Sequence, residues 1–292
     1  MNRSAKSKVL LTVVVVSALV FTGAVGYLIY GMVNKQNSQD TYDSLASSFA
    51  AGVQATTKRQ YATQINGTNN EGYTGDITSP AGTTVPEQVE HTVEVRVDDV
   101  DSPVTFEGLR KQNKEIYAWI YVPDTNINYP VLQSATDDNF YLSHDVYKNY
   151  SFPGAIYTQS HNKKDWSDRV TVLYGHNMAS GAMFANLHYF EDKSFFDSHP
   201  YIYIYADKRN LVYQVVSAFS YDSKHILNSY NFNDDKVYQS WLDQAKNPHS
   251  LYSNVRKDVS LDLNSKMIVL STCGGTGRYL VQGVLVRDER AE

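Results

Sequence analysis

The sequence predicts a mainly β fold, a barrel or a sandwich with helical additions, in the C-terminal part of the chain. Between residues 104 and 292, short apolar runs alternate with turn-forming residues, a pattern typical of many short strands. Two of these runs, 201–205 and 212–216, consist mainly of Tyr, Ile and Val, which favour strands. The chain contains 23 Tyr and 11 Phe, a content that suits aromatic-rich strands.

Composition narrows the function classes. The chain has 292 residues, enough for one or two domains, and its net charge of −5 gives no electrostatic footprint for nucleic acid. The balance of 42% hydrophobic and 20% charged residues is typical of a globular fold. A single cysteine excludes an intramolecular disulfide and a zinc site built from several cysteines. That cysteine is therefore either an inert core thiol or a reactive one.

Residues 9–33 are predicted to form a transmembrane anchor. They contain no charged residue, and a helix of 25 residues spans about 38 Å, compared with about 30 Å for the bilayer core. A buried core helix and a cleaved signal peptide are the alternatives, but the apolar run is longer than a signal peptide needs. Three positive charges precede the run, at Arg3, Lys6 and Lys8. They place residues 1–8 in the cytoplasm and the later chain outside the cell.

Residues 34–103 are predicted to be an extracellular tether. The stretch is rich in Ser, Thr, Gln, Asn and Gly, with few large aliphatic residues and a helical start over 41–49. If flexible, such a tether has a root-mean-square span of roughly 45 Å.

The remaining 189 residues, 104–292, are long enough to bury a sizeable core. They open with a helical pattern through Phe106, Leu109 and Ile116. Two further helices are expected over 183–190 and 234–246. Strands are expected at 119–122, 129–132, 154–157, 169–174, 201–205, 211–219, 266–270 and 279–286.

Cys273 stands where an apolar strand meets the Gly-rich turn that begins with Gly274 and Gly275. A strand end holds a side chain rigidly, and glycines let backbone N–H groups approach a developing oxyanion. The alternative is a buried structural cysteine with no chemical role, because most free cysteines are buried. The strand-end position in an exported chain favours a nucleophile.

A useful thiol needs a partner, and two residues have a suitable position. Of eight histidines, His176 follows the strand at 169–174 and one glycine, so it would face Cys273 if the two strands were neighbours. Arg278 opens the strand after the Gly-rich turn and would lie opposite Cys273 in a hairpin. Because a guanidinium stays charged, Arg278 could hold an oxyanion but could not act as a base. Arg287, at the far end of that strand, is the rival arginine.

These motifs resemble those of the sortase family. Residues 270–273, Leu-Ser-Thr-Cys, resemble the TLxTC signature, although Val269 replaces its first Thr. Residues 174–178, Tyr-Gly-His-Asn-Met, and 277–281, Gly-Arg-Tyr-Leu-Val, resemble the histidine and arginine motifs in the family's order. Further stretches resemble class B sortases: 113–116, 119–120, 128–133, 140–142, 154–156 and 234–246. The similarity covers nearly all of 104–292, although the loop from Cys273 to Arg278 is short for that class.

The resemblance implies an eight-stranded sortase-type β-barrel with an N-terminal helix and an inserted helix, in a membrane-anchored enzyme of a Gram-positive bacterium. It implies that Cys273 attacks the Thr carbonyl of a C-terminal sorting motif on a secreted protein. Arg278 would stabilise the oxyanion, and His176 would protonate the departing amine. The thioacyl-enzyme would transfer the protein to an amine, either a lipid-linked cell-wall precursor or a pilin Lys. No metal or organic cofactor is implied, and the residues expected to line the peptide groove are Leu142, Ser223, Leu227 and Ser271.

Two other readings remain open from the residues alone. A Cys–His wall-peptide hydrolase or an L,D-transpeptidase would also use Cys273, but such enzymes place the histidine close before the cysteine or the cysteine at a helix start. A non-catalytic, membrane-anchored β domain that binds a surface partner would tolerate the loss of Cys273.

Overall fold

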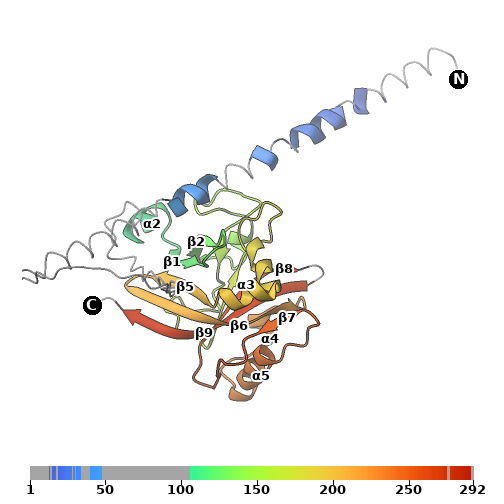
Figure 1. Cartoon of the computed structure of the whole chain (residues 1–292). Helices are drawn as coiled ribbons and strands as arrows, with labels where there is room; N and C mark the ends of the chain where they lie inside the picture. Colours follow the sequence, from blue (N-terminus) through green and yellow to red (C-terminus); the bar gives the residue numbers. More distant parts are fainter. Residues whose placement is uncertain are drawn as a thin grey trace, which may run out of the picture.

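The computed structural model describes residues 13–33 except 14, 18, 28 and 30, and residues 40–47, 106–274 and 277–290. In this part of the chain, nine strands form one sheet in the order β5-β1-β2-β3-β4-β8-β9-β6-β7. An additional pairing between β5 and β6 closes the first eight of them into a barrel (Figure 1). The strands are β1 (Ile116–Tyr121), β2 (Asn128–Leu132), β3 (Ile156–Tyr157), β4 (Val170–Tyr174), β5 (Tyr201–Ala206), β6 (Arg209–Tyr221), β7 (Ser253–Val255), β8 (Met267–Gly274) and β9 (Gly277–Arg290).

The mainly β prediction and the eight-stranded barrel are confirmed. Most neighbouring strands are antiparallel, and the parallel pairs are β2–β3 and β4–β8. The long strand β6 pairs with β5 through its first half and with β7 near its end, so β7 lies outside the closed ring. The helices are α2 (Phe106–Gln112), η2 (Phe140–Leu142), η3 (Ala185–Glu191), α3 (Lys193–Ser198), α4 (Ile226–Ser229) and α5 (Asp235–Lys246).

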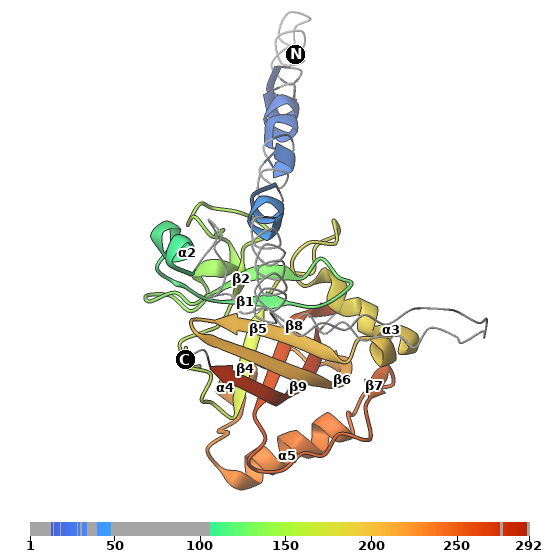
Figure 2. The ribbon, with the colours of Figure 1, turned by 60° about the vertical axis from the view of Figure 1, so that its left-hand side comes forward.

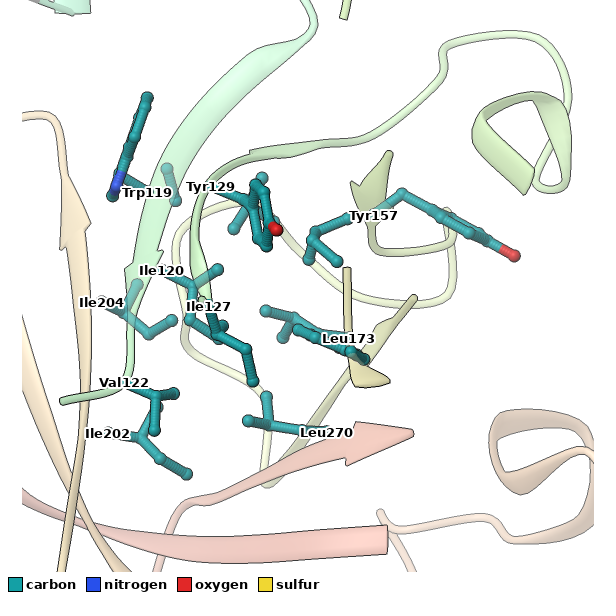
Figure 3. Close-up of a cluster of buried hydrophobic side chains, with 14 of the residues drawn as sticks. Trp119, Ile120, Val122, Ile127, Tyr129, Tyr157, Leu173, Ile202, Ile204 and Leu270 are labelled. Atoms are coloured by element: carbon teal, nitrogen blue, oxygen red, sulfur yellow. The ribbon is translucent and has the colours of Figure 1, made fainter. Parts of the chain in front are cut away.

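Side chains fill two separate apolar cores. Inward-facing residues of the strands meet inside the barrel, where Ile120 of β1 lies opposite Leu173 of β4 and Leu270 of β8 (Figure 3). Because successive strand residues point to opposite faces, the alternate residues of β4 and β8 pack outside the ring in a second core. The sheet is therefore covered on both faces at β4, β8 and β9.

Helix α5 covers this second core. It begins where the Asp234 side chain accepts hydrogen bonds from the backbone N–H groups of Lys236 and Val237, as an N-cap residue does. Its buried residues recur at helical spacing and form the face that packs on the sheet: Tyr238, Trp241, Leu242 and Ala245. In Figures 1 and 2, α5 lies on the opposite side of the barrel from the N-terminal helix.

Several element boundaries differ from those predicted. Ile116 belongs to β1 and not to the first helix, which ends at Gln112. The segment predicted as a helix at 183–190 forms the 3₁₀ helix η3, and α3 follows it. Strand β8 continues past 270 to Gly274, because β9 pairs with it along its whole length. Strand β7 and helix α4 were not predicted.

One described helix, Val15–Val33, is long and apolar enough to cross a membrane, and none of its most apolar window is buried. A second helix, residues 40–47, lies against the barrel. The hydroxyl of Tyr42 donates a hydrogen bond to the carbonyl of Gly154 (2.9 Å), and its ring packs edge-on against Tyr129. Most of the predicted tether, residues 48–103, lies outside the described residues, so the domain boundary at 103 stays a prediction.

Candidate active site

The β8–β9 hairpin places Cys273 and Arg278 side by side. The two residues form a cross-strand pair, and Gly274 pairs with Gly277 beside them. Arg278 Nη1 lies 3.6 Å from Cys273 Sγ, and the cysteine is exposed to solvent. A side chain at Gly277 would put its Cβ 2.3 Å from the carbonyl oxygen of Tyr221, so only glycine lets β6 approach this turn.

His176 reaches the same site from the neighbouring strand. Tyr174, the last residue of β4, pairs in parallel with Ser271, and Gly175 donates to the Ser271 carbonyl (3.2 Å). Two residues further along, His176 and Cys273 therefore stand at adjacent strand ends. The condition that the two strands be neighbours is met.

The imidazole of His176 is held from two sides. Its Nε2 lies 2.8 Å from the carbonyl oxygen of Leu142, and its ring stacks on Phe152 at 5.9 Å between centroids. Because a carbonyl only accepts, Nε2 carries a proton and donates a hydrogen bond to the Leu142 carbonyl. Within the described residues Nδ1 has no hydrogen-bond partner, which leaves this nitrogen available for substrate.

Tyrosines form the wall of the site next to Arg278. Burial raises the pKa of Tyr157 to about 12, although the positive charge of Arg278 acts in the opposite direction. Burial also raises the pKa of Tyr174, whose buried hydroxyl lacks a partner among the described residues. Both phenols therefore stay neutral at physiological pH, so neither supplies a negative charge to balance that of Arg278.

The residues expected to line a peptide groove occupy different environments. Leu142 is 43% exposed beside His176, and Ser223 is exposed in the turn after β6. Leu227, in α4, lines a cleft of about 560 Å³ together with His161. Ser271 is only 2% exposed, in strand β8. Their binding role stays a prediction.

Sequence reasoning missed a group of polar residues behind the cysteine. Asn177 Nδ2 and His188 Nε2 each lie 3.1 Å from the carbonyl oxygen of Cys273 and 3.1 Å from each other, and Glu191 accepts from His188 Nδ1 (2.6 Å). Two signals were present in the sequence: Asn177 stands in the motif at 174–178, and His188 and Glu191 are three residues apart.

Within the described part of the chain, His, Cys, Asp and Glu side chains form no group of three or more that could hold a metal ion. Gly275 and Thr276, which complete the hairpin turn, lie outside the described residues.

A family model of the sortase domain matches residues 120–286. The chain belongs to the sortase family. Sortase B of Listeria monocytogenes is 29% identical over 203 residues, which cover 67% of this chain and 80% of that protein. Sortase B of Staphylococcus aureus is 32% identical over 168 residues, which cover 58% of this chain and 67% of that protein.

Solved structures agree with this sortase assignment. The crystal structure of Clostridium perfringens sortase B superposes with a TM-score of 0.57 at 29% identity, over 63% of this chain and 100% of that chain. Staphylococcus aureus sortase B gives a TM-score of 0.56 at 31% identity, over 62% of this chain and 86% of that chain. The chain is therefore a class B sortase, a cysteine transpeptidase that anchors surface proteins. The prediction of an enzyme is confirmed, against the non-catalytic β domain and the wall-peptide hydrolase.

Proposed function

We propose that Cys273, His176 and Arg278 are the catalytic residues of this sortase, and that its substrate is a C-terminal sorting signal on a secreted protein. The observation that carries the assignment is the 3.6 Å contact between the guanidinium of Arg278 and the exposed thiol of the sole cysteine. A fixed cation beside the nucleophile lowers the energy of an oxyanion that forms there.

The reaction proceeds in two halves. His176 takes the thiol proton, and the Cys273 thiolate attacks the Thr carbonyl of the sorting motif. Arg278 stabilises the tetrahedral oxyanion, the peptide C–N bond breaks, and His176 returns the proton to the departing amine. An incoming amine then attacks the thioester and gives a proton to His176, and the thiolate leaves. A thiolate suits both halves because it is a good nucleophile and a good leaving group.

The acceptor amine is a lipid-linked peptidoglycan precursor or a pilin Lys. Residues 9–33 would anchor the enzyme in the cell membrane with a cytoplasmic N-terminus and an extracellular catalytic domain. The apolar helix Val15–Val33 supports this placement, as do the basic residues before it. Such an anchor confines the site to the membrane surface of a Gram-positive envelope.

The assignment can be tested on the full-length chain in detergent micelles with a library of Thr-containing sorting peptides. Intact-mass spectrometry should detect a thioacyl adduct on the wild type, and none on Cys273→Ala or His176→Ala. Arg278→Ala should fold normally and lose about 100- to 1,000-fold in kcat, the loss typical of a missing oxyanion donor. Arg287→Ala, in the outer part of the same strand, is the matched control and should keep wild-type turnover.

Transpeptidation by Cys273→Ala would refute the mechanism. Equal losses in Arg278→Ala and Arg287→Ala would show that the charge of the strand matters and not the contact with the thiol.

A further inference from the structure

The backbone carbonyl of Cys273 lies in the part of strand β8 that extends beyond the end of its neighbour, β4. Strand β4 ends at Tyr174, whereas β8 continues to Gly274. The Ser271 carbonyl still accepts from Gly175 N–H across this edge. Carbonyls two residues apart in a strand face the same edge, so the Cys273 carbonyl points to the place where β4 is missing. A strand carbonyl in that position needs another donor.

Two side chains replace the missing strand. Asn177 Nδ2 comes from the loop after β4, and His188 Nε2 comes from η3; each lies 3.1 Å from the Cys273 carbonyl oxygen. The residue that carries the thiol is therefore fixed on one side by β9 and on the other by these two side chains.

The ring of His188 is held by three polar groups. Its Nδ1 lies 2.6 Å from a carboxylate oxygen of Glu191, which only accepts, so Nδ1 carries a proton and Glu191 fixes the orientation of the ring. Its Nε2 lies 3.1 Å from the Cys273 carbonyl oxygen and 3.1 Å from Asn177 Nδ2. His188 therefore contacts the Cys273 carbonyl directly and also contacts the amide that donates to it.

His188 approaches Cys273 from the face opposite the thiol. Its ring stacks on Tyr279 at 4.8 Å between centroids, and Tyr279 belongs to the barrel core. Arg278, the preceding residue of the strand, points to the other face, where it contacts Sγ. His188 therefore acts on the peptide unit of Cys273 and not on the reacting atoms.

We propose that His188, held by Glu191, is a positioning residue that completes the hydrogen bonding of β8 at Cys273 and so aims the thiol at Arg278 and the substrate carbonyl. The inference rests on the proposed function, because it takes Cys273 as the nucleophile. Small displacements of a reacting group reduce turnover strongly, whereas peptide binding in the groove depends on other side chains.

Kinetics of full-length variants test the proposal. His188→Leu should lower kcat for thioacyl formation about tenfold while KM for the sorting peptide stays within about twofold of wild type. His188→Gln keeps an N–H donor for the carbonyl and should restore kcat to within about threefold of wild type. Glu191→Gln should fall between them, and adding it to His188→Leu should cost nothing further, because the two residues act as a unit.

His199 provides a matched control. Its ring also bridges a carboxylate and a backbone carbonyl, at Asp124 Oδ2 and Phe195 O (both 2.9 Å), and stacks on Phe195. It lies at the C-terminus of α3 and does not contact the Cys273 carbonyl. His199→Leu should lower the melting temperature and leave kcat of the folded enzyme unchanged.

Wild-type kcat in His188→Leu would overturn the inference, as would a His188→Gln variant no better than His188→Leu. Equal losses of kcat in His188→Leu and His199→Leu would also overturn it, because a general loss of stability would then explain both. These results leave the proposed function intact as long as Cys273→Ala is inactive. Activity in Cys273→Ala would instead refute the proposed function itself.

Discussion

The backbone at Gly175, next to His176, is packed so tightly that no side chain fits there. A Cβ atom at Gly175 would lie 2.6 Å from Ile156 Cδ1 and 2.7 Å from Phe184 Cγ, closer than real contacts allow. Ile156 and Phe184 are fully buried, so neither can move away without disturbing the core. Only glycine therefore fits at position 175, between the end of β4 and His176.

Gly175→Ala should therefore affect both stability and activity. Overpacking of this kind costs about 1–3 kcal/mol of the free energy of unfolding, which urea denaturation would measure. Turnover by the folded fraction should also fall, because the displaced backbone carries His176. Gly26→Ala is the control, since a Cβ there meets nothing within 4 Å. Unchanged stability in Gly175→Ala would mean that the packing relaxes freely.

At the scale of elements, an arginine–aspartate pair joins the start of β6 to the end of β9. Arg209 Nε and Nη2 each donate to one oxygen of the Asp288 carboxylate at 2.7 Å, and Nη1 donates to the carbonyl of Asp165. Hydrogen bonds from Arg209 lower the pKa of Asp288. A carboxyl group with a lowered pKa stabilises the folded state above its unfolded pKa of about 3.9, and that stability is lost as pH falls through the folded value.

Asp288→Asn should lower the free energy of unfolding at pH 7 by about 1 kcal/mol, a modest value because the pair is partly solvated. The variant should also lose less stability than the wild type between pH 4 and more acidic conditions. Urea denaturation at several pH values would measure both effects. Asp197→Asn removes a more exposed pair with Lys193 and should change stability by less than about 0.5 kcal/mol. Identical acid profiles for wild type and Asp288→Asn would contradict the pKa argument.

The elements differ in how far the sequence determines them. Strands such as β5 and β6 follow from local β propensity, and α5 follows from its apolar spacing and its cap at Asp234. The three-residue strand β7 exists because β6 extends beyond β5 and offers a free edge, which no local pattern records. Similarly, the length of β8 depends on its pairing with β9.

The same distinction holds in the site. Cys273 and Arg278 are five residues apart, so a hairpin prediction brings them together, and His176 needs only one strand pairing. The contact between His188 and Cys273 joins residues 85 positions apart through a 3₁₀ helix. Its partners are common surface residue types, so only tertiary structure could find it.

At the scale of the whole molecule, helix 40–47 is part of the packed domain although it lies far from the barrel in the sequence. Tyr42 and Leu45 of helix 40–47 are buried, and Tyr42 joins the barrel core through Tyr129 and Gly154. Burial raises the pKa of Tyr42, and the nearby Asp145 adds to this effect, so its hydroxyl stays a donor over the whole physiological range.

Tyr42→Ala should release helix 40–47 from the barrel. Loss of a buried aromatic ring lowers the free energy of unfolding by about 3–5 kcal/mol when the site cannot collapse. The decrease cannot exceed the free energy of docking the helix, because the helix then leaves the barrel. Limited proteolysis should then cut the chain near residue 42 faster than in the wild type. Tyr42→Phe keeps the ring, removes one hydrogen bond, and should cost about 1 kcal/mol. Equal cleavage of wild type and Tyr42→Ala would show that the docked helix does not depend on this side chain.

The docked helix has a geometric consequence for where the enzyme can work. Between Val33 and Asp40 the chain can reach at most roughly 25 Å, however long the stretch from 48 to 105 is. With the apolar helix in the bilayer, the barrel would be held close to the lipid headgroups. Cargo would then have to be presented within a few nanometres of the lipid surface, and could not be collected from deep within the surrounding wall.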